Sequence, residues 1–277
     1  LAAWQSQHLN RFVLIAALLG LALVEWTGPG PGRYSNIHNS KSNRFLNALT
    51  QHDDLARWLR KQPGPVRVVV DDQSIGANFG DWHGIDMLQG YVAGVNRSLL
   101  EHDYHTERTQ RLFAITHYLG TKPNLPGQRD VFTSASGLKL FASPDPLPRA
   151  RIVHKAEAVE SLDWMRLRIQ EPETDIAQVA LFLHRAPKLE TCGEPDRLKP
   201  LYRNTDSAAY ETELGCRGLL IVAENHYPGW EALVDGKPAR LLPAYGTLRA
   251  VVLEKGKHLV EMRFRPRSVY FGAALTL

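Results

Sequence analysis

The fold is decided over residues 217–241, which read RGLLIVAENHYPGWEALVDGKPARL. The segment opens with an apolar run over 217–224 that predicts a β-strand. Two more strands are expected, one before and one after Asp235-Gly236. This dipeptide is a strong hairpin signal because both residues tolerate a positive φ. This segment therefore predicts antiparallel β structure in the C-terminal half of the chain.

The same kind of pattern extends on both sides of this segment. Residues 254–257 are expected to join two of the strands in another hairpin. Many short strands with turns about every ten residues favour a β-sandwich over 149–267. The further strands are predicted over 151–153, 164–169, 179–183, 208–214, 248–253 and 258–264.

The N-terminal half has a different pattern. Apolar residues recur at helical spacing over 44–62, and Pro63-Gly64-Pro65 ends this helix before a β-branched strand at 66–70. A longer helical pattern covers 97–118, and a β-hairpin is predicted over 131–141. Together these elements predict an α/β subdomain over 44–148. The fold class is accordingly α+β, with an α/β subdomain followed by an antiparallel β-sandwich.

Both ends of the chain carry apolar segments. The sequence opens on Leu1, has an apolar segment over 9–26, and closes on the apolar run 268–277. We expect a piece of a membrane protein, with a transmembrane helix at 9–26, a Gly/Pro/Ser/Asn-rich linker at 27–43, and a second, truncated span from 268. A signal sequence and a buried soluble helix are the alternatives for 9–26. If Arg11 marks the cytoplasmic side of this helix, the middle of the chain lies outside the cytoplasm.

The net charge and the cysteine content indicate which classes of function and which kinds of site the sequence does not support. The net charge of +4 is too small to indicate nucleic-acid binding, and no zinc-finger or basic-aromatic pattern is found. The two cysteines, Cys192 and Cys216, flank a loop-rich segment, and outside the cytoplasm they favour a disulfide over two thiols. No spacing of Cys or His predicts a metal site, and no motif predicts a cofactor.

One short segment combines the side chains that a sugar site needs. Residues 78–86 read NFGDWHGID and place Asp81, Trp82 and His83 next to one another. An indole face stacks on the CH groups of a sugar, and neighbouring polar groups bond its hydroxyls. Tyr91 is expected on the same surface. A helix cap and ordinary packing explain the same residues, so both interpretations stay open.

Two other groups are weaker candidates. Asp71-Asp72 follow a predicted strand, where ligands bind in open α/β sheets, but an acidic pair there is also typical of a turn or cap. Tyr227-Pro228-Gly229-Trp230 is either a sugar platform or a bent strand whose Trp230 fills the core. No catalytic residue is predicted.

Residues 216–277 resemble the C-terminal extracytoplasmic region of the YfhO-like bacterial membrane proteins. The resemblance rests on Tyr-Pro-Gly-Trp at 227–230, Val-Asp-Gly at 234–236, Gly-Lys-His at 256–258, and Phe264-Arg265-Pro266 before the final apolar run. It is weaker over 66–150. The resemblance implies structural roles for Trp230, for Asp235-Gly236 and for Gly256.

That family is similar to multi-spanning glycosyltransferases that use lipid-linked sugar donors. The resemblance implies a parent protein in the bacterial cytoplasmic membrane that transfers a sugar to a cell-envelope glycan, with its catalytic loop outside this chain. Its partners would be the lipid bilayer, a lipid-linked sugar and a glycan acceptor. The alternative is a non-enzymatic glycan- or partner-binding scaffold of a transport or assembly protein. A secreted hydrolase is the weakest hypothesis, since its only candidate catalytic groups are Asp71-Asp72 and Asp81 with His83.

Overall fold

The computed structural model describes residues 11–27, 50–71, 73–76, 78–89 and 102–276. The chain divides into two units, residues 1–52 and residues 53–277. Asp72, Tyr91 and residues 28–43 of the predicted linker lie outside the described residues.

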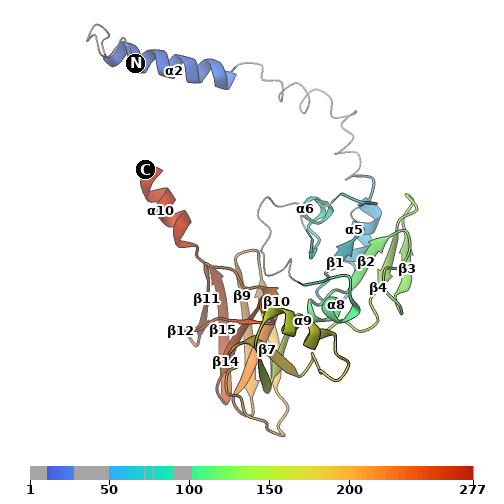
Figure 1. Cartoon of the computed structure of the whole chain (residues 1–277). Helices are drawn as coiled ribbons and strands as arrows, with labels where there is room; N and C mark the ends of the chain where they lie inside the picture. Colours follow the sequence, from blue (N-terminus) through green and yellow to red (C-terminus); the bar gives the residue numbers. More distant parts are fainter. Residues whose placement is uncertain (1–10, 28–49, 72, 77, 90–101, 277) are drawn as a thin grey trace. The chain divides into compact units, whose positions relative to one another are not determined.

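The first unit contains helix α2 (Arg11–Thr27), shown in blue in Figure 1. Many of its apolar side chains are exposed, as in Phe12, Leu21 and Val24. At the other end of the chain, α10 (Arg267–Thr276) in the second unit also buries none of its residues. None of the helices that the structure describes combines the length and the apolar character needed to cross a membrane.

The second unit begins with a helix and a four-stranded sheet. Helix α5 (Asp53–Arg60) precedes β1 (Val68–Val70), β2 (His117–Gly120), β3 (Arg129–Thr133) and β4 (Lys139–Ala142). The sheet order is β1-β2-β4-β3, with β1 and β2 parallel and the other pairs antiparallel. The predicted hairpin over 131–141 is therefore confirmed as β3–β4. Two short helices, α6 (Phe79–His83) and α8 (Glu107–Leu112), lie in the connection between β1 and β2.

Both faces of β1 are buried. Val68 and Val70 pack with Leu55 and Leu59 of α5, whereas Val69, which points to the opposite face, belongs to a larger cluster. That larger cluster also contains apolar residues from 153–250, such as Ile221. One continuous core therefore extends from the helix-covered sheet into the C-terminal half, across the boundary predicted near residue 148.

The C-terminal half is built from three sheets (Figure 1). One has the order β13-β14-β10-β5, the second β12-β11-β15-β9-β8, and β6 pairs with β7 in parallel around helix α9 (Leu162–Gln170). The chain is thus a β-rich mixture of helices and sheets. The strands are β5 (Ala150–Val153), β6 (Lys155–Val159), β7 (Val179–Leu183), β8 (Arg197–Arg203), β9 (Ser207–Leu214), β10 (Gly218–Asn225), β11 (Trp230–Val234), β12 (Lys237–Ala239), β13 (Leu242–Ala244), β14 (Leu248–Leu253) and β15 (Gly256–Phe264).

Strand β10 explains why its sequence is apolar without alternation. Leu219 and Ile221 point into the large cluster, while Leu220 and Val222 point into another cluster shared with the five-stranded sheet. A strand that is covered on both faces needs apolar residues at every position. The four side chains are fully buried, so β10 is the central strand of the C-terminal half.

In the C-terminal half the structure confirms one predicted hairpin and contradicts another. β11 and β12 pair across Asp235 and Gly236, whose φ angles are +53° and +76°, as a tight two-residue turn requires. The hairpin predicted across 254–257 is wrong. β14 pairs with β10 and β13, whereas β15 pairs with β9 and β11, so the four residues carry the chain from one sheet to the other.

The strand predicted over 164–169 is also wrong, because these residues form α9. Met165 and Ile169, four residues apart, are buried, while Trp164 and Leu167 are exposed. The buried positions follow the helical period, although polar and apolar residues alternate along this segment as they do in a strand. Ser161 caps the helix by accepting a hydrogen bond from Trp164 N.

The predicted disulfide is present. Cys192 and Cys216 are bonded, with their Cα atoms 6.1 Å apart and a separation of 24 positions in sequence. The bridge joins the segment before β8 to the connection between β9 and β10. It therefore links the beginnings of strands in two different sheets.

Burial of His117 predicts a loss of stability in acid. The ring makes an edge contact with Trp58 at 5.5 Å, and its burial lowers the pKa from 6.5 to about 4. Below pH 6.5 the unfolded chain takes up a proton that the folded chain accepts only near pH 4, so unfolding becomes easier across that interval. A shift of this size corresponds to about 3 kcal/mol. Urea unfolding at pH 7 and pH 4.5 should show a smaller loss for His117→Gln than for the unchanged chain, and equal losses would contradict this account.

Candidate functional site

The predicted sugar-binding segment folds into helix α6 and the turn after it. Trp82 is 51% exposed and Asp81 beside it is exposed, so both side chains are open to a ligand. His83 is buried instead. Its ring lies 4.7 Å from that of Phe79, and its Nδ1 lies 3.5 Å from an Asp53 oxygen. The structure thus buries His83 while its neighbours Asp81 and Trp82 are exposed.

The turn after α6 is fixed by backbone geometry. Gly84 ends the helix with a φ of +65°, a conformation that glycine adopts without strain. The guanidinium of Arg60 donates a hydrogen bond to the carbonyl of His83. These contacts hold the next residues, Ile85 and Asp86, against β1, where Val68 N donates to Asp86 O at 2.8 Å.

Asp71 has a local structural role. Its side chain accepts hydrogen bonds from Gln73 N at 3.2 Å and from the Ser74 hydroxyl at 2.5 Å. This arrangement is that of an Asx-type turn at the end of β1. The turn interpretation of this residue accounts for both contacts.

Beyond Asp86 the structure assembles a group of charged side chains that the sequence analysis did not identify. We call it the arginine–carboxylate cluster. It joins the helix-covered sheet to the C-terminal sheets and comprises Arg67, Asp86, Arg149, Arg203, Glu224 and Arg249.

Glu224 is the centre of the cluster. Its two carboxylate oxygens lie 3.0 Å from a nitrogen of Arg67 and 2.8 Å from Nε of Arg149. A nitrogen of Arg203 lies 3.5 Å away. Asp86 is the second acidic member and accepts from Arg149 at 2.8 Å and from Arg203. Two carboxylates thus bridge three guanidinium groups.

Arg67 ties the two halves together through backbone contacts as well. Its Nη1 donates to the carbonyl of Phe113 at 2.9 Å and to that of Ala223 at 2.6 Å. Ala223 lies in β10, while Arg67 immediately precedes β1. Its Nε is buried and has no hydrogen-bond partner among the described residues. A buried, incompletely bonded guanidinium raises the cost of losing its carboxylate partner.

Arg249 borders the cluster and contacts the Tyr-Pro-Gly-Trp segment. Its guanidinium carbon lies 3.3 Å from the ring centroid of Trp230, and its Nε donates to Asn225 O at 2.9 Å. Trp230 is half-buried and also packs at 5.4 Å on Phe264. Tyr227, by contrast, is 51% exposed. Pro228-Gly229 bends the chain, with Gly229 at a φ of +105°.

The electrostatics favour a permanently charged cluster. Burial alone would raise the pKa of Glu224, but four arginines outweigh it and hold that pKa below its usual value. Burial lowers the pKa of Arg249 to about 10, which still leaves it charged at neutral pH. A carboxyl that donates protons in catalysis needs a raised pKa. Glu224 is therefore suited to fixing arginines in place.

The net charge of the cluster and the exposure of its arginines bear on what it can bind. Four guanidinium groups and two carboxylates leave it with a net positive charge. The side chain of Arg203 is 36% exposed, whereas those of Arg67 and Arg149 are 7% and 8% exposed. A guanidinium presented in this way binds phosphate or carboxylate groups. Both terminal nitrogens of Arg203, however, already face the carboxylates of Asp86 and Glu224, so the arrangement serves to hold the two halves together.

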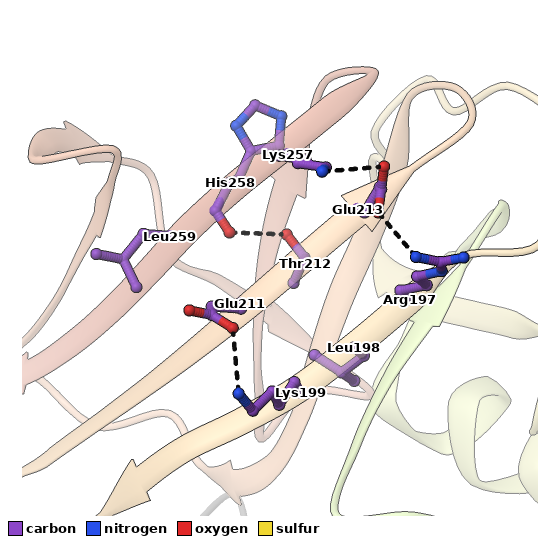
Figure 2. A pocket seen from close by; sticks show the side chains of 9 residues that line it. All are labelled: Arg197, Leu198, Lys199, Glu211, Thr212, Glu213, Lys257, His258 and Leu259. Carbon is purple, nitrogen blue, oxygen red and sulfur yellow. Dashed lines mark hydrogen bonds and ion pairs between the residues drawn. The ribbon is translucent and has the colours of Figure 1, made fainter.

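A shallow groove of about 510 Å³ lies elsewhere, on the outer face of the five-stranded sheet (Figure 2). Figure 2 shows its ion pairs running across the strands, with Glu213 between Arg197 and Lys257 at 3.8 Å each. Lys199 pairs with Glu211 at 3.7 Å. Such exposed pairs stabilise a protein little, and Lys and Pro residues on the edge strand β8 hinder pairing with another chain.

No protein family, characterised protein or solved structure matches this chain significantly.

Proposed function

We propose that this chain is the extracytoplasmic part of a bacterial membrane protein of the glycosyltransferase type, similar to the YfhO-like proteins. In this proposal the chain lacks the catalytic loop, and it covers the membrane active site or holds the glycan acceptor. The bilayer, a lipid-linked sugar and an envelope glycan are its partners. The C-terminal sheets would form a β-sandwich, which is supported by one apolar cluster that combines Leu220 of β10 with Val260 of β15.

The disulfide supports the extracytoplasmic location. Disulfides persist in oxidising compartments and are rare in the cytosol of most organisms. The exposed apolar helices α2 and α10 support a role at a membrane, since large exposed apolar surfaces mark sites of contact with a membrane or a partner.

The exposed indole of Trp82 is the observation that carries the acceptor role. It stands beside the exposed carboxylate of Asp81, which is the pairing of apolar face and hydrogen-bonding group that a sugar ring requires. The turn after it is held by Gly84 and by the backbone bond of Asp86 to β1. A ligand at Trp82 would thus contact a part of the surface that is already ordered.

The test is sugar transfer by the membrane protein that carries this chain. Trp82→Ala and Asp81→Ala should each lower the rate of transfer to the envelope acceptor by about 10-fold, because a stacked aromatic or a charged hydrogen bond contributes roughly 1–2 kcal/mol. Trp164→Ala is the matched control, since Trp164 is 54% exposed on α9. Unchanged transfer in both Trp82 and Asp81 variants would reject the acceptor role of this segment.

A second candidate is a non-enzymatic binding or scaffold domain. The groove in Figure 2, whose lining includes the exposed side chain of Leu259 on β15, is the observation that favours it. This candidate predicts binding of a glycan or partner without any transfer activity in the membrane protein. Sugar transfer that depends on Trp82 would decide against it.

A further inference from the structure

A histidine lies beside the disulfide. His154, between β5 and β6, places its Nδ1 at 3.7 Å from the sulfur of Cys216. Nδ1 and the sulfurs of Cys192 and Cys216 all lie within 4.8 Å of one another. A Cβ on Gly218 would stand 2.8 Å from Cε1 of this ring, so the glycine permits the close approach.

A carboxylate fixes the orientation of this ring. Oδ2 of Asp196 lies 2.8 Å from Nε2 of His154. On the other side of the ring, Nδ1 lies 2.9 Å from the carbonyl oxygen of Glu190, 3.3 Å from that of Arg217 and 3.7 Å from Sγ of Cys216. The side chains of His154 and Asp196 are each only 18% exposed. A carboxylate that binds the second ring nitrogen is the usual support of a metal-bound histidine, because it fixes the ring and increases its basicity.

The separation of His154 from Cys216 agrees with zinc coordination, whereas the two sulfurs, bonded to each other in the disulfide, have to move apart when the bridge is reduced. With zinc–sulfur and zinc–nitrogen bonds of about 2.3 and 2.0–2.1 Å, a tetrahedral site separates nitrogen from sulfur by about 3.6 Å. The separation of 3.7 Å between His154 and Cys216 already matches this value. Glu194 offers a carboxylate in the same corner: its Oε2 and Cys192 Sγ lie 3.0 and 3.4 Å from the Cβ position of Gly215.

We propose that this corner is a redox-dependent zinc site, closed while the disulfide is present and formed by Cys192, Cys216 and His154 when it is reduced. An external dithiol reduces the bridge, giving two protein thiols and the disulfide of the reductant. One Zn²⁺ then binds both thiolates with release of their two protons. His154 Nδ1 gives up its contacts with the carbonyls of Glu190 and Arg217, loses the proton it donates to them and becomes the third ligand. The Glu194 carboxylate or water completes the tetrahedron. The disulfide and the zinc complex are thus alternative cross-links at one place.

The test is metal titration of the whole chain. The protein is reduced with a phosphine, freed of reductant without oxygen, and titrated with Co²⁺ as a spectroscopic substitute for Zn²⁺. One equivalent should give tetrahedral d–d bands and a thiolate-to-metal charge-transfer band, and Zn²⁺ should displace it. The unreduced chain should give neither band. His154→Ala should weaken binding at least 10-fold, and Asp196→Asn by about 10- to 100-fold.

His258→Ala is the matched control. His258 is also paired with a carboxylate at 2.8 Å, that of Asp235, but the metal cluster does not include it. It should leave Co²⁺ affinity unchanged. A reduced chain without the charge-transfer band would overturn the proposal, as would equal affinities for His154→Ala and the unchanged chain. Circular dichroism would overturn it as well if the chain unfolded on reduction and Zn²⁺ did not restore the fold.

Discussion

Replacing Glu224 by Gln should lower the free energy of unfolding by about 3–5 kcal/mol, because removal of one partner leaves buried charges without compensation. The carboxylate lies within 3.0 Å of nitrogens of both Arg67 and Arg149, whose side chains are less than a tenth exposed. Neutral Gln keeps the shape but cannot offset those charges. Urea unfolding at pH 7 measures the effect.

The control for this variant is Glu254→Gln. Glu254 pairs with Arg217 at 2.6 Å, but its side chain is 65% exposed. Exposed pairs contribute about 1 kcal/mol or less, so this variant should be nearly as stable as the unchanged chain. Similar losses in the two variants would show that burial of the cluster does not matter.

Acid titration separates the contribution of Glu224 from that of His117. Because the pKa of Glu224 is lowered in the folded state, its stabilisation is present above the unfolded value of 4.5 and disappears as the pH falls through the folded value. Loss of stability below pH 4.5 should therefore be reduced in Glu224→Gln. Loss between pH 6.5 and 4 should be reduced in His117→Gln.

The second large effect is expected at Tyr245. Its side chain is fully buried, and its hydroxyl donates to the carbonyls of Ile176, at 3.0 Å, and of Val179. Its backbone N donates to Leu181 O at 2.7 Å. Tyr245 thus holds the segment before β7, and β7 itself, against the connection between β13 and β14.

Tyr245→Ala should lower the free energy of unfolding by about 3–5 kcal/mol, as a large cavity in a core does. Tyr245→Phe should cost about 1–3 kcal/mol, since it leaves buried carbonyls without their donor. Tyr227→Ala is the control, because Tyr227 is 51% exposed. Its variant should change stability by less than about 1 kcal/mol. Denaturant titration of the three variants measures these differences. Equal stability of Tyr245→Ala and Tyr227→Ala would contradict the role given to Tyr245.

Three members of the arginine–carboxylate cluster lie in or next to apolar runs of the sequence, and the structure explains why. Arg67, Glu224 and Arg249 each interrupt an apolar or β-branched run: VRVVV, LLIVAEN and LRAVV. A charged residue within such a run is expensive to bury unless it is paired. The sequence indicates that partners are needed. It does not say which residues they are, because Glu224 and Arg67 lie 157 positions apart and meet only through the packing of β1 near β10.

Local chemistry alone determined several features of this protein. The turn at Asp235-Gly236 needs two residues that accept a positive φ, and the apolar run of β10 requires cover on both faces, whatever the rest of the fold. Tertiary structure decided the rest. Residues 254–257 link two sheets because β14 and β15 find their partners in β10 and β9, and 162–170 form a helix because Met165 and Ile169 reach the core four residues apart. The partners of β14 and β15 and the burial of α9 are settled by contacts between residues distant in sequence, which no local pattern encodes.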